Sequence, residues 1–137
     1  MFPIASVGGA ACLVRLFLAD DMPAVREVMR FCLGSAPGHY QVVGEAGDGI
    51  AALACIIELA PDVIILDVDM PGMNGLEVVR ELRSRGYEQP VILCSSWEGP
   101  DGHDLPAGIT HCLQKPFRFE SLTAAVESVA ACLMHAD

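Results

Sequence analysis

The sequence predicts an α/β fold in which helices cover both faces of a doubly wound, five-stranded parallel sheet. Short apolar runs and amphipathic stretches alternate five times along the chain. The run over residues 63–66 (VIIL) is apolar at every position, which is typical of a strand buried on both faces. A strand followed by a helix and another strand forms a crossover unit whose two strands are parallel. No repeat or linker interrupts this alternation, so we expect one domain.

The expected elements follow from the apolar patterns, taken in chain order. The first half contains a strand from residue 14 that ends in the acidic pair at 20–21, a helix over 23–33, a strand over 41–45 and a helix over 49–60. The second half contains a strand over 63–66, a helix from 76 to about 86, strands over 90–96 and 109–114, and a helix over 120–134.

Local signals fix several helix ends. Pro23 suits a first helical turn, where its missing N–H costs nothing, and Gly34 is expected to stop that helix. Asp48 is expected to cap the second helix, which Pro61 closes. The inner stripe expected for the first helix is Val25, Val28, Met29 and Cys32.

The stretch over residues 97–108 departs from the alternation. It contains Gly99, Pro100, Gly102, Pro106 and Gly108. Because glycine and proline destabilise a helix interior, we expect the fourth helix to be short or broken.

Composition bounds the class of protein. The chain has 137 residues, of which 53% are hydrophobic, and this excludes disorder and suits one compact domain. Its 18 acidic and 8 basic residues give a net charge of −10, which disfavours nucleic acid and anionic membranes as direct partners and favours a divalent cation.

The cellular location and the domain bounds are inferred from the apolar runs and the cysteines. No apolar run reaches transmembrane length, and residues 1–13 lack the basic region of a signal peptide. We therefore expect residues 1–13 to be a flexible extension and residues 14–137 to be the domain. The six cysteines form no CxxC pair, which disfavours a zinc site and fits the reducing cytoplasm.

Polar side chains end four of the expected strands: Asp20 and Asp21, Asp67, Ser95, and Lys115. Each residue alone could merely end its strand, but the ends of parallel strands meet at one edge of the sheet. Clustered carboxylates repel one another, and Mg²⁺ would relieve that repulsion. A metal, a lysine and a hydroxyl around one carboxylate form a site for a phosphoryl group, which Asp67 would attack.

These residues carry a family resemblance. The acidic pair at 20–21, the LDVDMPGMNG stretch at 66–75, Ser95 after its apolar strand and KPF at 115–117 resemble the receiver domain of a two-component response regulator, over about residues 14–134. The resemblance implies a flavodoxin-like sheet with strand order 2-1-3-4-5.

The resemblance also implies roles for the residues. Asp67 is the phosphoacceptor, Ser95 and Lys115 contact the phosphoryl group, and the Lys115–Pro116 bond is cis in most members. The implied ligands of Mg²⁺ (or Mn²⁺) are Asp21, Asp67 and the backbone carbonyl of Asp69, with Asp20 assisting through water.

As function, the resemblance implies signal relay. A histidine kinase or phosphotransfer protein donates the phosphoryl group, and a downstream effector domain or protein responds. The implied protein is cytoplasmic, can form a homodimer on phosphorylation, and binds neither nucleic acid nor membrane through this domain. It is a regulator rather than an enzyme, with only self-catalysed phosphotransfer and dephosphorylation.

Two features depart from the family pattern: the residue three positions before the lysine, and the Gly/Pro-rich stretch over residues 97–108 in place of the fourth helix. Cys112, preceded by His111, occupies the position three residues before the lysine, where Tyr or Phe is usual. A cysteine is too small to act as an aromatic gate, so we expect residues 97–108 to move on phosphorylation instead.

Two other functions stay open on the residues alone. Asp67-Val68-Asp69 is similar to the nucleophile and acid pair of haloacid dehalogenase phosphohydrolases, although that reading leaves Asp20-Asp21 unexplained. Turnover of a small phosphomonoester would identify such an enzyme. A phosphorylation-independent interaction module is the third possibility, and the complete set of acids, hydroxyl and lysine argues against it.

Overall fold

The computed structural model describes residues 13–35, 40–96 and 106–135. Its elements are β1 (Val14–Ala19), α1 (Pro23–Ser35), β2 (Tyr40–Ala46), α2 (Gly49–Leu59), β3 (Val63–Asp67), α3 (Gly75–Ser84), β4 (Val91–Ser95), β5 (Ile109–Gln114) and α4 (Phe119–His135). All strand pairs are parallel, and the strand order is β2-β1-β3-β4-β5. The predicted sheet and its order are therefore confirmed.

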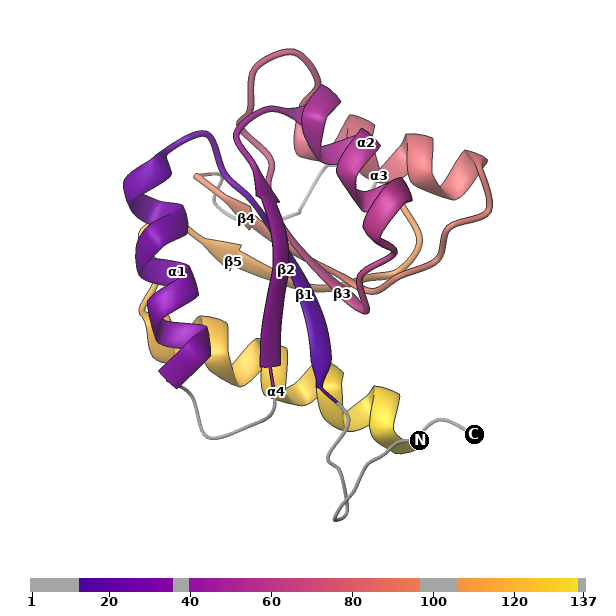
Figure 1. The fold of residues 1–137 in the computed structure, drawn as a ribbon. Helices are drawn as coiled ribbons and strands as arrows, with labels where there is room; N and C mark the ends of the chain where they lie inside the picture. Colours follow the sequence, from indigo (N-terminus) through magenta and orange to yellow (C-terminus); the bar gives the residue numbers. More distant parts are fainter. Residues whose placement is uncertain (1–12, 36–39, 97–105, 136–137) are drawn as a thin grey trace.

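The sheet is the middle of three layers. Helices α2 and α3 cover one face, and α1 and α4 cover the other (Figure 1). The core accordingly divides into two apolar clusters. Along β3, Ile64 and Leu66 belong to the cluster under α2 and α3, whereas Val63 and Ile65 belong to the cluster under α1 and α4. This alternation explains why β3 is apolar at successive positions.

Side-chain caps fix two helix starts. The carboxylate of Asp48 accepts a hydrogen bond of 2.8 Å from the backbone N–H of Ala51, as predicted. Asn74 and Glu77 form a reciprocal capping box at the start of α3, with two bonds of 2.9 Å.

Helix α1 differs from the prediction in two respects. It continues through Gly34 to Ser35, because Gly34 keeps a negative φ and buried Leu33 holds the last turn against the sheet. The inner stripe is centred on Met29 and Leu33, four residues apart, and Val28 lies on the solvent side with 41% exposure.

Some predicted features fall outside the described residues. These are most of the extension over residues 1–13 and most of the fourth-helix region, since residues 1–12 and 97–105 are not described. Within the described ranges, no helix combines the length and apolarity needed to cross a membrane.

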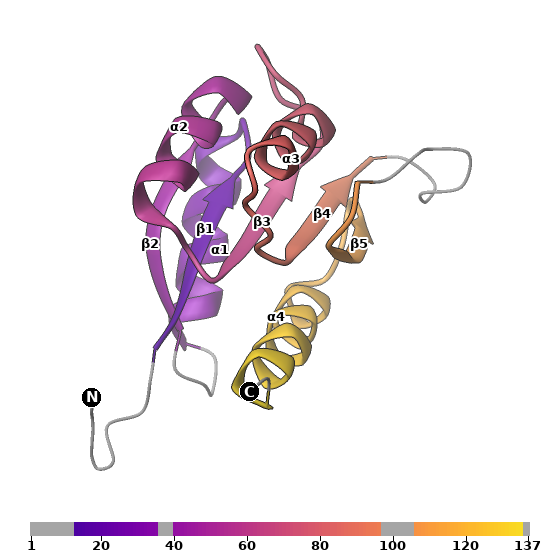
Figure 2. The same ribbon diagram turned by 90° about the vertical axis from the view of Figure 1, so that its right-hand side faces the viewer.

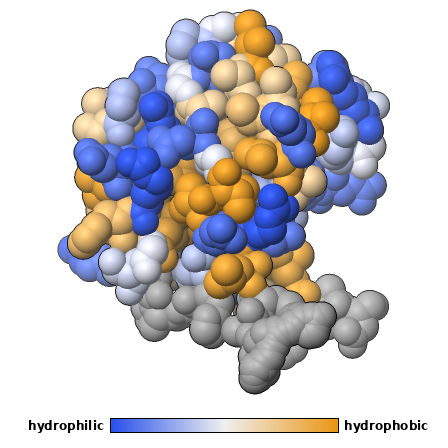
Figure 3. All heavy atoms as spheres, in the orientation of Figure 1, coloured by the Kyte–Doolittle hydropathy of each residue, from blue (hydrophilic) through white to orange (hydrophobic). Residues whose placement is uncertain are grey.

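The surface carries scattered apolar side chains. Figure 3 shows hydrophobic areas between hydrophilic ones on one face of the molecule. Large exposed side chains include Phe31 on α1 and Ile50 on α2.

Two arginines bind the backbone at the amino edge of the sheet. The guanidinium of Arg83 donates to the carbonyls of Ala107, Tyr87 and Gln89 at 2.7, 3.0 and 2.8 Å. Gly108 lies under it with φ +85°, and a Cβ there would lie 2.4 Å from Arg83 Nη2. The guanidinium of Arg15 likewise donates to the carbonyls of Ala60 and Leu59, both at 2.8 Å.

Candidate functional site

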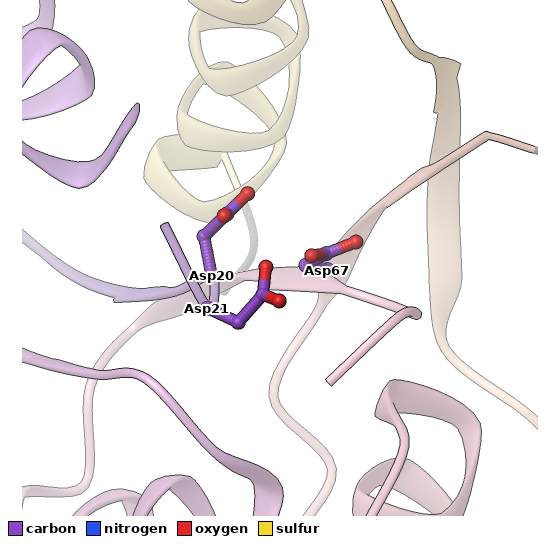
Figure 4. A group of neighbouring side chains, drawn as sticks. All are labelled: Asp20, Asp21 and Asp67. Carbon is purple, nitrogen blue, oxygen red and sulfur yellow. The ribbon is translucent and has the colours of Figure 1, made fainter. Parts of the chain in front are cut away.

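Three carboxylates gather at the opposite, carboxyl edge of the sheet, where the strand arrows end in Figure 2. Ala19 pairs with Leu66, so the next residues, Asp20 and Asp67, are neighbours across β1 and β3. Each of Asp20, Asp21 and Asp67 contributes a carboxylate oxygen to a group whose members lie within 4.8 Å of one another (Figure 4). Asp20 and Asp67 are buried, and Asp21 is exposed.

Lys115 reaches the same point from the end of β5. Its ammonium Nζ lies 2.8 Å from Asp20 Oδ2 and 3.2 Å from Asp67 Oδ2. Its backbone N–H donates to the carbonyl of Ser95 at 2.6 Å, and its peptide bond to Pro116 is cis. Burial lowers the pKa of Lys115, but the hydrogen bond to Asp20 and the charges of Asp67 and Asp20 together raise it by more, so the ammonium stays charged.

The two oxygens of Asp67 have different surroundings. Oδ1 accepts a hydrogen bond of 3.1 Å from the backbone N–H of Asp69. Oδ2 is buried and lies 3.2 Å from the Lys115 ammonium, which also donates a hydrogen bond of 2.8 Å to Asp20 Oδ2. The ammonium of Lys115, with its three N–H donors, thus faces the carboxylates of Asp20 and Asp67 at once.

Burial dominates the electrostatics of Asp67. It raises the pKa of this carboxyl to about 6, assisted by the nearby charge of Asp20. The Asp69 N–H and the Lys115 charge act in the opposite direction but do not cancel the effect of burial.

Sequence reasoning missed a contact of a neighbouring hydroxyl. Ser95 ends β4 and is half-buried, one residue after Cys94, which pairs with Asp67. The next residue, Ser96, donates a hydrogen bond of 3.0 Å to Asp69 Oδ2. The sequence shows two consecutive serines, but only the path of the chain after β4 decides which one meets this carboxylate.

Gly75 brings the start of α3 close to the end of β3. A Cβ at this position would lie 2.5 Å from the backbone oxygen of Asp67, so only glycine permits this approach. The Gly75 N–H donates to the carbonyl of Val68 at 2.9 Å. This contact fixes the loop that follows Asp67.

The donor set suits a hard divalent cation. The three carboxylates face one ammonium, so the cluster carries excess negative charge. Oxygen-only ligands of this kind fit Mg²⁺ or Mn²⁺.

Comparison with known proteins gives a consistent result. The family model "Response regulator receiver domain" matches residues 16–127. The chain is 39% identical over 118 residues to the response regulator MprA of Mycobacterium sp. (strain KMS), covering 85% of this chain and 50% of that protein. It is 44% identical over 89 residues to protein-glutamate methylesterase/protein-glutamine glutaminase 5 of Anaeromyxobacter dehalogenans, covering 65% of this chain and 24% of that protein.

A solved structure matches the fold as well. The response regulator TrrA from Thermotoga maritima, in complex with Mg²⁺-BeF, superposes with a TM-score of 0.75 at 27% identity, covering 85% of this chain and 99% of that one. The chain spans half or less of the two relatives named above, one of which is named as an enzyme. The matched family, the sheet order and the acidic cluster agree, and the chain belongs to the response regulator receiver domain family of two-component signal transduction.

Proposed function

We propose that this chain is a phosphoacceptor, in which Asp67 receives a phosphoryl group from the phosphohistidine of a histidine kinase or phosphotransfer protein. The observation that carries the proposal is Asp67 Oδ2, which is buried at the carboxyl edge of the sheet and lies 3.2 Å from Lys115 Nζ. An anionic nucleophile in that position faces a fixed positive charge that can also neutralise an incoming phosphoryl group.

The chain has ligands for the cation that this chemistry needs. Asp21, Asp67 and the backbone carbonyl of Asp69 would hold Mg²⁺ or Mn²⁺, with Asp20 assisting. When bound, the cation neutralises charge on the phosphoryl oxygens. The Mg²⁺-BeF complex of the relative TrrA supports this assignment.

The reaction is a displacement at phosphorus. A carboxylate oxygen of Asp67 forms the new O–P bond while the P–N bond to the donor imidazole breaks, and that imidazole leaves with a proton. Lys115 neutralises a phosphoryl oxygen and Ser95 donates a hydrogen bond to another. Later attack of water on phosphorus breaks the O–P bond, which releases phosphate and restores the carboxylate.

The output of the domain is conformational. We assign residues 14–137 to the receiver and place the downstream effector in another domain or a separate protein, with homodimer formation on phosphorylation as one route of output. The chain itself acts as a regulator in the cytoplasm rather than as an enzyme with multiple turnover.

Incubation with acetyl phosphate and Mg²⁺, followed by intact-mass measurement, tests the proposal. We expect a single phosphate adduct in the parent chain, and none in Asp67→Asn or with EDTA in place of Mg²⁺. Asp62→Asn is the matched control, because it makes the same change just before the same strand, at its other end. No adduct in the parent, or an adduct that persists in Asp67→Asn, would contradict the assignment.

A further inference from the structure

We propose that Arg26 is a positioning residue for the divalent cation, because it fixes the backbone carbonyl of Asp20 and thereby the placement of Asp21. The inference rests on the proposed cation site. It concerns a residue outside the acidic cluster, on the first turns of α1, whose side chain is 17% exposed.

The guanidinium of Arg26 joins two elements. Its Nη1 donates to the backbone oxygen of Asp20 at 2.6 Å, and its Nε donates to Glu45 Oε1 on β2 at 2.8 Å. The other oxygen of Glu45 accepts from Arg30 Nη1 at 2.6 Å. Glu45 is thus held from both sides, and it fixes the plane of the Arg26 guanidinium.

Gly47 provides room for this arrangement. A Cβ at position 47 would lie 3.0 Å from Arg26 Nη1, closer than most side chains tolerate. The guanidinium therefore occupies the space over a glycine next to the end of β2.

Every polar group of Asp20 has a partner. Its N–H donates to the carbonyl of Ala46 at 3.1 Å, Oδ1 accepts from the Met22 N–H at 2.9 Å, and Oδ2 accepts from Lys115 at 2.8 Å. Arg26 supplies the remaining contact, to the carbonyl. That carbonyl belongs to the planar peptide that joins Asp20 to Asp21, so holding the carbonyl also fixes the position of the Asp21 Cα.

Asp21 depends on this support. It is exposed, yet its carboxylate lies within 4.8 Å of those of Asp20 and Asp67. An exposed side chain on a short loop has rotamer freedom of its own, so a fixed backbone is the main means of keeping it aimed at the cluster.

Charge and position make opposite predictions for the loss of Arg26. Removing a positive charge near the cluster would, by electrostatics alone, tighten the binding of a cation. Losing the hold on the Asp20 carbonyl would weaken it. Arg30 is a matched control because it binds the same Glu45 from the same helix, whereas the described hydrogen bond to the Asp20 carbonyl comes from Arg26.

Calorimetric titration of the full chain with Mg²⁺ decides between them. We expect Arg26→Met to raise the Kd about tenfold, as for the loss of one charge-assisted hydrogen bond, and Arg30→Met to change it less than about twofold. An unchanged or lower Kd in Arg26→Met, or equal weakening in both variants, would overturn the inference. No Mg²⁺ binding by the parent would instead refute the proposed cation site itself.

Thermal unfolding in EDTA separates positioning from simple stability. A merely structural Arg26 would lower the melting temperature of Arg26→Met and leave the Kd of its folded form at the parent value. If Arg26→Met does not fold, Arg26→Lys serves instead: it keeps the charge but has no planar fork to reach Glu45 and Asp20 together. Weaker Mg²⁺ binding in Arg26→Lys supports the inference, and parent-like binding rejects it.

Discussion

The two edges of the sheet differ in how their charged side chains are paired. At the amino edge, Arg15 and Arg83 direct their guanidinium groups at backbone carbonyls, which satisfies both donors and acceptors. At the carboxyl edge, three carboxylates share one ammonium, and burial of Asp67 opposes its ionisation.

The difference indicates which edge stabilises the fold and which edge binds a ligand. Satisfied hydrogen bonds at the amino edge close the turns before β3, β4 and β5 and add stability. Crowded acceptors at the carboxyl edge cost stability, and the proposed cation would offset part of that cost. Removing an arginine from the amino edge and neutralising a buried carboxylate at the carboxyl edge should therefore change stability in opposite directions.

Arg83→Ala should give the largest effect. Three backbone carbonyls lose their donor, and Gly108 loses the guanidinium that covers it, so we expect the free energy of unfolding to fall by about 3 kcal/mol. Chemical denaturation measures this loss. Arg85→Ala, which removes only an exposed pair with Glu81, should cost about 0.5 kcal/mol or less. Equal losses in the two variants would show that Arg83 is not a structural clamp.

Asp67→Asn should act in the opposite direction. Burial raises the pKa of Asp67 to about 6 from an ordinary value of 3.8, so the native state binds this proton more tightly than the unfolded chain does. Stability therefore falls as pH rises between those two values and stays lower above them. Without divalent cations at pH 7.5, we expect Asp67→Asn to be more stable than the parent by about 2 kcal/mol.

Denaturation of Asp67→Asn and parent across a pH series checks this sign. The difference should shrink towards pH 4, where the carboxyl of the native parent is protonated. A variant that is less stable than the parent at pH 7.5 would show that the Lys115 ion pair outweighs the cost of burial.

Mg²⁺ should offset part of the loss of stability that the clustered carboxylates cause at the carboxyl edge. At a concentration tenfold above its Kd, the cation should stabilise the parent by about 1.4 kcal/mol. Asp21→Ala should weaken this response by removing one of the clustered carboxylates. Glu58→Ala, which removes an exposed carboxylate on α2, is the control and should respond like the parent. Identical melting shifts in Asp21→Ala and parent would remove Asp21 from the site.

Ser96→Ala should have the smallest effect. Its hydrogen bond to Asp69 is exposed, so we expect a loss of about 0.5 kcal/mol in the absence of cation. Ser84→Ala removes an exposed serine hydrogen bond to the backbone carbonyl of Glu81 and provides the comparison. A loss well above that of Ser84→Ala would mean that the Ser96 contact orders the loop after β3.

The sequence alone determined the layered fold, because its signals are local. The apolar runs placed all five strands within about one residue, and Asp48 capped α2 as expected. The rule that parallel strands end at one edge was enough to predict that Asp67 and Lys115 would lie near the acidic pair.

Tertiary structure decided which side chains are buried and which distant groups they contact, because local sequence signals do not contain this information. Whether Val28 or Leu33 faces the core depends on how α1 is rotated against the sheet, and the helix continues past Gly34 because buried Leu33 holds its last turn. Asp20 is buried while its neighbour Asp21 is exposed, and Arg26 extends from α1 to both Asp20 and Glu45. Both features depend on how the strands and helices pack in space. A long arginine side chain has many possible partners, and only the packed arrangement of the strands and helices selects among them.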